Sequence, residues 1–566
     1  MSLGHAPDHE DAFVSSSEFC RSRLSDTSIY ALLHREGHRL FADTSFADLF
    51  REVGRDSVPP RIVAVVMVLQ RIEALSDREA VDRFTFDLRW KYAAGGLDYN
   101  YPGFVHTVLV DMRARLRRSE RPNRIFETAL DVAHLAGLVG RKRVLDSTPL
   151  YDAVATQDTV TLVRSAIRGL LRVVEASLAA ELRGVCKRDD DYVAPGKPTC
   201  EWDDEAAREA LIDALARDAY AILAALDGRT LSQEVREAAQ LLATVVGQDL
   251  EQTSEGIFRI ARRVAPDRVI STVDPETRHG HKTAARGFDG YKGHIAIDPD
   301  SEIITATDVT PGNAADGSVA EALLSDVLSP ASQSKATTSE APTTSEATAA
   351  VSAQSSETAA MSSEMPSSSE PESAGEGEDG AIEIYGDSSY GTANIVEKIE
   401  AAGAQANVKV QAPSARAGHF GKDDFDIDLA ANTVRCPAGV LVKIGAKPDG
   451  GGLASFGAAC AGCAMRSRCT DGKLGRGIRI HPKEATLQRS RARQQSPTWK
   501  AQYRATRPKV ERKLGHLVYR KHGGRRARMR GCERIRHDFA LLAAAHNLKR
   551  LATLGVCFTG SKWVTA

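Results

Sequence analysis

The sequence predicts a mixed α/β protein in which a central sheet is interrupted by insertions. Two short apolar stretches, one before Asp146 and one before Asp387, are typical of buried strands that end in an acid. Between them, alternating apolar residues on both sides of an Asp-Pro-Asp turn predict a β-hairpin. Long stretches with apolar residues at helical spacing flank these strands, as expected for a sheet covered by helices.

Composition limits the class of protein. The chain has 566 residues, enough for several domains, and its longest apolar run, Ile62 to Leu69, is far too short to span a bilayer. No apolar signal segment is visible near the N-terminus. The nine cysteines are unevenly spread and do not suggest a disulfide framework. We therefore expect a cytoplasmic protein with no membrane partner.

Residues 1–140 are predicted to form an all-α N-terminal domain that binds DNA. The stretch VPPRIVAVVMVLQRIEALSDREAVDRF contains one buried helix followed by a turn. Ser76 and Glu79 then form a capping box at the start of the next helix. Two helices joined in this way fit either a helix-turn-helix DNA reader or a helical bundle.

The first strand of the sheet is expected in RVLDSTPLYDAV, where it ends at Asp146. Residues 159–262 are predicted to be a helical insertion, because apolar residues from Val163 to Leu178 repeat at helical spacing. Strand-like sequence resumes only at Val269. The insertion therefore separates the first strand from the rest of the sheet.

The hairpin is predicted in GYKGHIAIDPDSEIITATDV. Its first strand ends at Ile297, Asp298 begins the Asp-Pro-Asp turn, and the return strand runs from Ile303 to Val309. A short helix, Ser318 to Leu328, follows.

Residues 329–380 consist mainly of Ser, Thr, Glu, Ala and Pro. Such a segment cannot bury enough apolar surface to offset its chain entropy, so we predict a disordered insertion. The strand IEIYG follows directly and ends in Asp387, and a helix begins near Thr392. Asp387 is then either the N-cap of that helix or part of a site at the carboxyl end of a strand.

Residues 413–499 are predicted to be a Cys-rich insertion. Cys436, Cys460, Cys463 and Cys469 follow the pattern C-x23-C-x2-C-x5-C. Thiolates at such spacing are typical of a tetrahedral structural Zn²⁺ site, and this segment is otherwise too rich in loops to hold itself together. The alternative is four reduced thiols without a ligand.

Without the insertions, the elements follow the order β, β, β, α, β, α, β, α, which is that of a ribonuclease H-like mixed sheet. In this topology the first and fourth strands are neighbours, which would bring Asp146 and Asp387 together. Two such carboxylates repel each other unless cations lie between them. Glu511, the only acid in a long basic stretch, is a candidate third ligand for a two-metal site. The predicted catalytic core combines residues 141–158, 263–328, 381–412 and 500–556.

The C-terminal part of the chain is strongly basic, although the net charge of the whole chain is −1. Residues 489–550 contain 19 Lys and Arg against three acids, whereas residues 331–380 contain nine acids and one Lys. A basic block of this size exceeds what solubility requires and indicates a polyanion as partner.

Several of these segments together resemble the DDE transposases of bacterial insertion sequences. The resemblance is carried by RVLDSTPLYDAV, GYKGHIAIDPDSEIITATDVTPGNAAD, YGDSSYGTA, the Cys-rich segment and RPKVERKLGHL with the helix after it. It implies that Asp146, Asp387 and Glu511 are the catalytic and metal-binding triad.

Related transposases carry a Tyr-x2-Arg-x3-Glu-x6-Lys signature around the glutamate. Arg507 and Glu511 match the Arg-x3-Glu part of this signature. Tyr503 is one residue farther from the arginine than the signature requires, and Val518 stands where the lysine belongs.

The resemblance implies Mg²⁺ (or Mn²⁺) as cofactor, DNA at the transposon ends and at the target as partner, and a homodimer on DNA in a bacterial cytoplasm. Cutting and rejoining DNA is in-line displacement at phosphorus, in which carboxylates hold the metal ions and basic side chains bind the phosphates. The residues expected at phosphates are Lys282, Lys292, Arg507, Arg512, Lys513, Arg525, Arg526, Arg528 and Arg530.

Two rival functions stay open at this point: a catalytically inactive, zinc-containing DNA-binding protein derived from a transposase, and a plain ribonuclease H-like nuclease. Acids at two strand ends and on a basic helix favour an enzyme. Three further acids lie near the same strands. Asp274 is the main rival of Asp146, whereas Asp298 is predicted to be a turn residue and Asp316 to cap the next helix.

Overall fold

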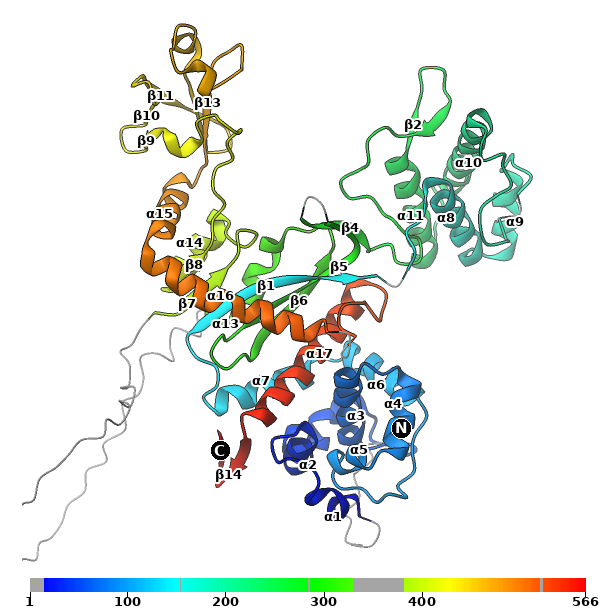
Figure 1. The fold of residues 1–566 in the computed structure, drawn as a ribbon. Coiled ribbons are helices and arrows are strands. Elements are labelled where there is room, and N and C mark those ends of the chain that lie inside the picture. The colour runs from blue at the N-terminus through cyan, green and yellow to red at the C-terminus, as the bar shows by residue number, and fades with distance from the viewer. Residues whose placement is uncertain are drawn as a thin grey trace, which may run out of the picture.

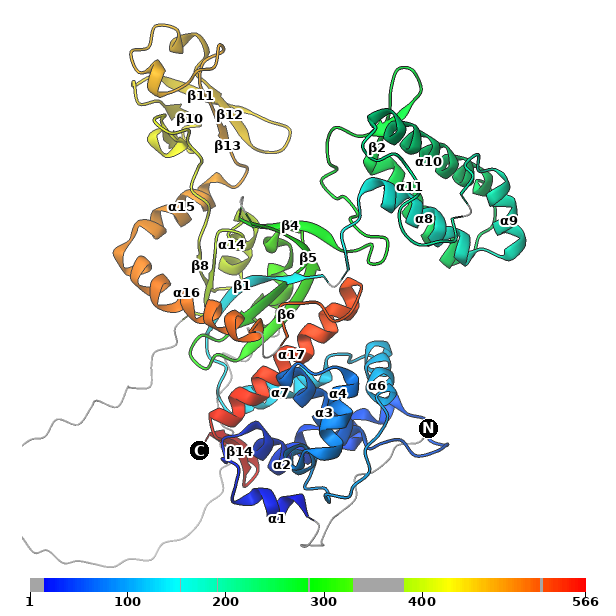
Figure 2. The same cartoon turned by 45° about the vertical axis from the view of Figure 1, so that its right-hand side comes forward.

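A computed structural model describes residues 15–152, 154–190, 192–283, 286–328, 381–519 and 523–565 (Figure 1). A mixed sheet lies at its centre, and the helices of the N-terminal part gather on one side of it (Figures 1 and 2). The helical and the Cys-rich insertions extend away from the sheet in both views. The predicted disordered tract, residues 329–380, lies outside the described residues.

The central sheet has the ribonuclease H-like topology that the element order predicted. Neighbouring strands follow the path β4-β5-β1-β7-β8, and β6 pairs with the second half of β5. The pairs β1–β5 and β5–β6 are antiparallel, whereas β1–β7 and β7–β8 are parallel. The strands are β1 (Lys142–Tyr151), β4 (Arg278–Thr283), β5 (Arg286–Ile297), β6 (Ile304–Pro311), β7 (Glu383–Gly386) and β8 (Gln405–Val408).

Strand β1 is longer than predicted and does not end at Asp146. It pairs with β5 from Val144 to Tyr151, but the pairing with β7 stops at Val144. Between Leu145 and Leu150 the strand therefore pairs with β5 alone, and the open side tolerates Pro149, which has no N–H to donate. At Tyr151 the open side is closed again by a bridge to Arg526. Asp146 consequently lies in the middle of a strand.

The hairpin of β5 and β6 is confirmed. Its turn is held by Asp298, whose Oδ1 accepts the backbone N–H groups of Asp300 and Ser301 at 3.0 and 2.8 Å. The prediction of a single helix after the hairpin is wrong. That helix is replaced by a 3-10 turn (Asp316–Val319) and two short helices, α12 (Ala320–Leu323) and α13 (Ser325–Leu328).

Apolar residues pack on both faces of the sheet, because side chains alternate along each strand. Val144 belongs to the cluster on the face covered by α17 (Cys532–Thr553), and Leu145 to the cluster with α12 and α14 (Ala393–Ala401). Asn547 of α17 binds both backbone groups of Ile304 at 2.9 and 2.8 Å. This pair of hydrogen bonds fixes α17 on the edge strand β6.

The N-terminal helices surround one buried helix. In α3, 12 of the 14 residues are buried, and the apolar cluster around it is continuous with α17 and the sheet. The capping box of Ser76 and Glu79 is confirmed at the start of α4. The side chain of each residue accepts a hydrogen bond from the backbone N–H of the other. The packing is that of a helical bundle. Its helices are α1 (Ser16–Arg21), α2 (Ile29–Leu40), α3 (Pro60–Glu73), α4 (Asp77–Phe86), α5 (Leu88–Ala93), α6 (Thr107–Arg118) and α7 (Arg124–Leu135).

The helical insertion has an apolar core of its own, separate from that of the sheet. Its first predicted helix breaks at Val174, which is the C-cap of α8. A two-stranded hairpin, β2 (Leu250–Gln252) and β3 (Phe258–Ile260), completes the insertion. Its helices are α8 (Thr159–Val173), α9 (Ala176–Gly184), α10 (Glu205–Leu226) and α11 (Gln233–Asp249).

The Cys-rich insertion is a small antiparallel sheet with strand order β13-β12-β11-β10-β9. Its strands are β9 (Asp426–Asp428), β10 (Thr433–Arg435), β11 (Leu441–Ala446), β12 (Gly452–Ser455) and β13 (Gly477–Ile480). Helix α15 (Glu484–Gln495) leads back to the central sheet, where α16 (Pro497–Leu517) lies across β1 and β7. The chain closes with the hairpin β14 (Val556–Thr559) and β15 (Lys562–Thr565). In the described part of the chain, no helix has the length and apolarity needed to cross a membrane.

Candidate active site

Asp146, Asp387 and Glu511 converge on one place although they are far apart in the chain. The last residue pair between β1 and β7 joins Val144 to Tyr385, and an acid follows two residues later in each segment. Because the two strands are parallel, both acids lie at the same level, two residues beyond the last β1–β7 pair. Glu511 comes from α16, which packs against both strands.

Aromatic side chains anchor α16 beside these strands. The hydroxyl of Tyr503 donates to the carbonyl of Gly386 at 3.1 Å, next to Asp387. The ring of Trp499 stacks on that of Tyr503, with centroids 4.7 Å apart. Tyr503 thus contacts the end of β7 even though it is one residue out of register with the transposase signature.

The guanidinium group of Arg507 lies between the three carboxylates. Its Nη2 is 2.8 Å from Oδ1 of Asp146 and 3.9 Å from Oδ2 of Asp387. Its Nη1 is 3.6 Å from Oε1 of Glu511. The side chains of Arg507 and Asp146 are 9% and 13% exposed, whereas those of Asp387 and Glu511 are 40% and 61% exposed. The site is therefore buried at Asp146 and open to solvent at Glu511.

Burial and charge act against each other at this site. Burial raises the pKa of Asp146, and the Arg507 guanidinium offsets only part of that rise. Burial alone would lower the pKa of Arg507, but the charge and hydrogen bond of Asp146, together with Tyr503 and Asp387, outweigh it and raise the pKa. The arginine is thus firmly charged, and it compensates the buried acid.

The chemistry of the three acids suits a hard divalent cation, since Mg²⁺ prefers carboxylate oxygens. Among the described residues, however, no group of three or more His, Cys, Asp or Glu side chains is arranged to hold a metal ion. The cation that contacts all three acids is the Arg507 guanidinium. A divalent ion bound by Asp146 would have to displace that guanidinium.

A buried polar network supports the triad from the neighbouring residues of the sheet. Ser147, the residue after Asp146, donates through Oγ to Oδ2 of Asp316 at 2.7 Å. The ammonium of Lys292 donates to Oδ1 of Asp316 at 2.8 Å. The prediction that Asp316 caps a helix is wrong, because its side chain makes no cap bond and binds β1 and β5 instead.

Sequence reasoning missed His294 and Tyr390 as parts of this network. Nδ1 of His294 lies 2.9 Å from the hydroxyl of Tyr390, and its Nε2 lies 2.9 Å from Oγ1 of Thr310. Burial lowers the pKa of His294 to about 4, so the ring is neutral at neutral pH. Burial, with the charges of Asp316 and then Asp146, raises the pKa of Tyr390. No spacing in the sequence could have linked these residues, since they come from separate elements.

The other acids near the strands have structural partners. Asp274 is buried and accepts hydrogen bonds from the hydroxyl of Tyr291 at 2.8 Å and the N–H of Gly531 at 3.2 Å. The interpretation of Asp387 as a helix N-cap is wrong, because Thr392 caps α14. Asp387 Oδ1 instead accepts the N–H of Ser389 at 2.9 Å, within the turn after β7.

The residues predicted to contact phosphates differ in their exposure to solvent and in whether another residue already binds them. Lys292 is bound to Asp316, and Arg512 forms an ion pair with Glu302. Lys513 is 3% exposed, and burial lowers its pKa to about 8. Arg528 donates to the carbonyl of Leu75 at 2.5 Å. The exposed members of the set are Lys282, Arg512, Arg525, Arg526 and Arg530.

Cys436, Cys460, Cys463 and Cys469 line one pocket in the small sheet. Burial raises the pKa of Cys469, and the three other thiols are close enough to add to the shift. The backbone N–H of Arg476 donates to Sγ of Cys460 at 3.4 Å. The thiols are thus neighbours, but in the described residues they do not form a group arranged to hold a metal ion. The zinc site stays a prediction.

Three family models match the chain. The model described as "Transposase domain (DUF772)" matches residues 30–115, which span α2 to α6. Two models described as "Transposase DDE domain" match residues 260–335 and 435–552. The second of these ranges contains Arg507 and Glu511, whereas Asp146 and Asp387 lie outside all three. No curated protein and no solved structure matches the chain significantly.

Proposed function

Because this chain belongs to the DDE transposases of insertion sequences, we propose that it cleaves and joins DNA strands at the ends of its element through Asp146, Asp387 and Glu511. The observation that carries the proposal is the contact of one guanidinium with all three carboxylates, from three separate elements. The matches to DDE domains favour this enzyme over a catalytically inactive DNA-binding protein.

In the proposed reaction, Asp146, Asp387 and Glu511 would hold two Mg²⁺ (or Mn²⁺) ions. Bound there, such ions would supply activation of the attacking oxygen and stabilisation of the leaving oxygen at phosphorus. Asp146 is fixed by β1 and Asp387 by the turn after β7, so the two acids need little rearrangement. The solvent-exposed Glu511 faces the side from which a DNA strand enters.

Arg507 is proposed to leave the acids when the ions bind and to contact the DNA phosphate at the same place. A planar guanidinium suits this exchange, because it binds carboxylate and phosphate oxygens with the same geometry. The exposed arginines at 525, 526 and 530 extend the phosphate-binding surface beyond the acids. Each phosphate contact adds affinity without regard to sequence.

Two further features belong to the proposal. An insertion sequence has two ends and each chain has one acid triad, so the active form on DNA is a homodimer. Cys436, Cys460, Cys463 and Cys469 hold one structural Zn²⁺, which cross-links the small sheet.

The proposal is tested with a labelled DNA fragment that carries the ends of the element, with and without Mg²⁺. Asp146→Asn, Asp387→Asn and Glu511→Gln should each reduce cleavage on the order of 10⁴-fold, as expected when one member of a catalytic unit is removed. DNA affinity should change little.

Asp300→Asn is the matched control. Asp300 is an exposed acid that pairs with Lys509 of α16 but does not contact the triad. The Asp300→Asn variant should cleave DNA like the native chain. Mg²⁺-dependent cleavage that survives all three triad substitutions would contradict the proposed function.

A further inference from the structure

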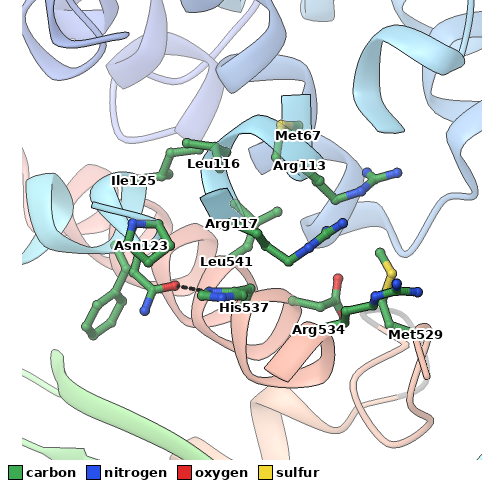
Figure 3. A pocket seen from close by; sticks show the side chains of 13 residues that line it. Met67, Arg113, Leu116, Arg117, Asn123, Ile125, Met529, Arg534, His537 and Leu541 are labelled. Carbon is green, nitrogen blue, oxygen red and sulfur yellow. Dashed lines mark hydrogen bonds between the residues drawn. The ribbon is translucent and has the colours of Figure 1, made fainter. Parts of the chain in front are cut away.

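A pocket lies between the N-terminal helices and α17, and none of the three acids or Arg507 lines it. Its floor is apolar: Met67 of α3, Leu116 of α6 and Leu541 of α17 are 1%, 5% and 8% exposed. Arg113 and Arg117 from α6 and Arg534 from α17 border it, and Figure 3 shows their guanidinium ends on one side. We call this the α6–α17 pocket.

The acids around the α6–α17 pocket are already paired. Asp538 accepts from Arg71 at 3.3 Å, and Asp77 forms an ion pair with Arg113. By contrast, the side chains of Arg117 and Arg534 form no hydrogen bond or ion pair with any residue that the structure describes. The pocket therefore has two cations without partners among the described residues.

The uncompensated charges are close enough to repel one another. Burial lowers the pKa of Arg117, and the guanidinium groups of Arg534 and Arg113 lower it further, whereas Glu533 acts weakly in the other direction. Among the described residues, Nε and Nη1 of buried Arg71, which pairs with Asp538 of the pocket, and Nη1 of Arg528 have no hydrogen-bond partner. An anion placed between Arg117 and Arg534 would relieve this repulsion.

We propose that the α6–α17 pocket is an anion site that receives a backbone phosphate of bound DNA, with the adjoining deoxyribose against the apolar floor. Arginine is suited to this ligand because its fork of N–H groups matches phosphate oxygens. The inference rests on the proposed function, since it assumes that DNA is the substrate.

The course of the chain favours a DNA strand over a free phosphate. Tyr151, five residues after Asp146 in β1, exchanges backbone hydrogen bonds with Arg525 and Ala527. The exposed Arg526 and Arg530 follow on the same segment, and Met529 between them lines the pocket. A series of cations therefore leads from the strand of Asp146 to the α6–α17 pocket, which suits a continuous polyanion.

The test compares the salt dependence of DNA binding in Arg117→Gln, Arg534→Gln and the double variant, all made in the full-length Asp146→Asn chain so that no cleavage intervenes. Affinity for a duplex is measured by fluorescence anisotropy from low to high salt. Each phosphate contact contributes about 0.9 to the slope of log K against log salt, so the double variant should lose about 1 to 2 units of slope. The double Arg→Lys variant keeps the charge and should retain most of the slope.

Arg172→Gln with Arg236→Gln is the matched control, because both arginines are exposed on the helical insertion and neither forms an ion pair with a described residue. The slope of this control should equal that of the parent. A double Arg117 and Arg534 variant with the slope of the control would overturn the inference.

Inorganic phosphate distinguishes the two sources of the anion. If millimolar phosphate raises the melting temperature of the parent but not of the double variant, while the DNA slopes are equal, the pocket takes free phosphate and the inference fails. Failure of the proposed function would appear in the cleavage assay, as absent cleavage by the native chain. The comparison of salt slopes could still be interpreted, because it measures DNA binding without cleavage.

Discussion

The acid triad and the cysteine pocket are both groups of potential metal ligands, but the chain holds them in different ways. Asp146 and Asp387 are placed by paired strands of the central sheet, and an arginine compensates their charge. The cysteines lie on turns and short 3-10 segments beside strands of three to six residues. The comparison teaches that paired strands fix the positions of the acids without a metal, and it predicts that the small sheet needs a metal cross-link as well as its small apolar core.

The largest expected effect is therefore in the Cys-rich insertion. We expect about one Zn²⁺ per purified chain, and its removal by a chelator should unfold the small sheet, since structural zinc contributes about 10 kcal/mol or more in small zinc domains. Limited proteolysis should then cut within residues 413–483 and spare the central sheet.

Cys460→Ser should reproduce the effect of the chelator. Cys557→Ser, which changes a cysteine outside the pocket, should not. Protein without zinc by elemental analysis, and with an unchanged proteolysis pattern after chelation, would show that the thiols are unligated.

When no metal is present, the stability of the chain around the three acids should instead depend on Arg507. Arg507→Gln leaves the largely buried Asp146 without a cation, and breaking a buried ion pair costs about 3–5 kcal/mol. Chemical denaturation should show this loss, and millimolar Mg²⁺ should restore part of it by taking the place of the guanidinium.

Arg504→Gln is the control for that measurement. It changes an exposed arginine on the same helix, which forms no ion pair with a described residue. Equal stability of the two variants without Mg²⁺ would mean that Arg507 does not compensate the acids.

A smaller effect is expected from the network beside the triad. His294 is neutral in the folded chain because burial lowers its pKa to about 4, whereas an unfolded histidine has a pKa of about 6.5. The unfolded chain therefore takes up the proton first, and stability present above pH 6.5 is lost as pH falls toward 4. The loss should total about 3 kcal/mol.

His294→Gln should reduce this loss of stability at acidic pH. The measurement is the free energy of unfolding between pH 7 and pH 4. His281→Gln, at an exposed position of β4, is the control. An equal loss of stability between pH 7 and pH 4 in His294→Gln and in the native chain would show that other groups dominate acid unfolding.

The sequence by itself predicted the order of the main strands and helices and proposed Asp146, Asp387 and Glu511 as site residues, and the structure brings these three acids together. Periodicity distinguished strands from helices, and the rarity of acids around Glu511 singled that residue out. The capping box at Ser76 and the turn at Asp298 were equally readable, because each depends on residues only three apart. Local patterns of this kind need no knowledge of the fold.

Only the tertiary structure decided the rest. The length of β1 depends on β5, which lies more than 130 residues away in the chain, so the position of Asp146 within the strand could not be read locally. The role of Asp316 changed from helix cap to partner of Ser147 and Lys292, for the same reason. Arg507 between the acids also arises from contacts between distant segments, as do Arg117 and Arg534, which have no ion-pair partner among the described residues. Charge balance is a property of such contacts, and a linear pattern does not contain it.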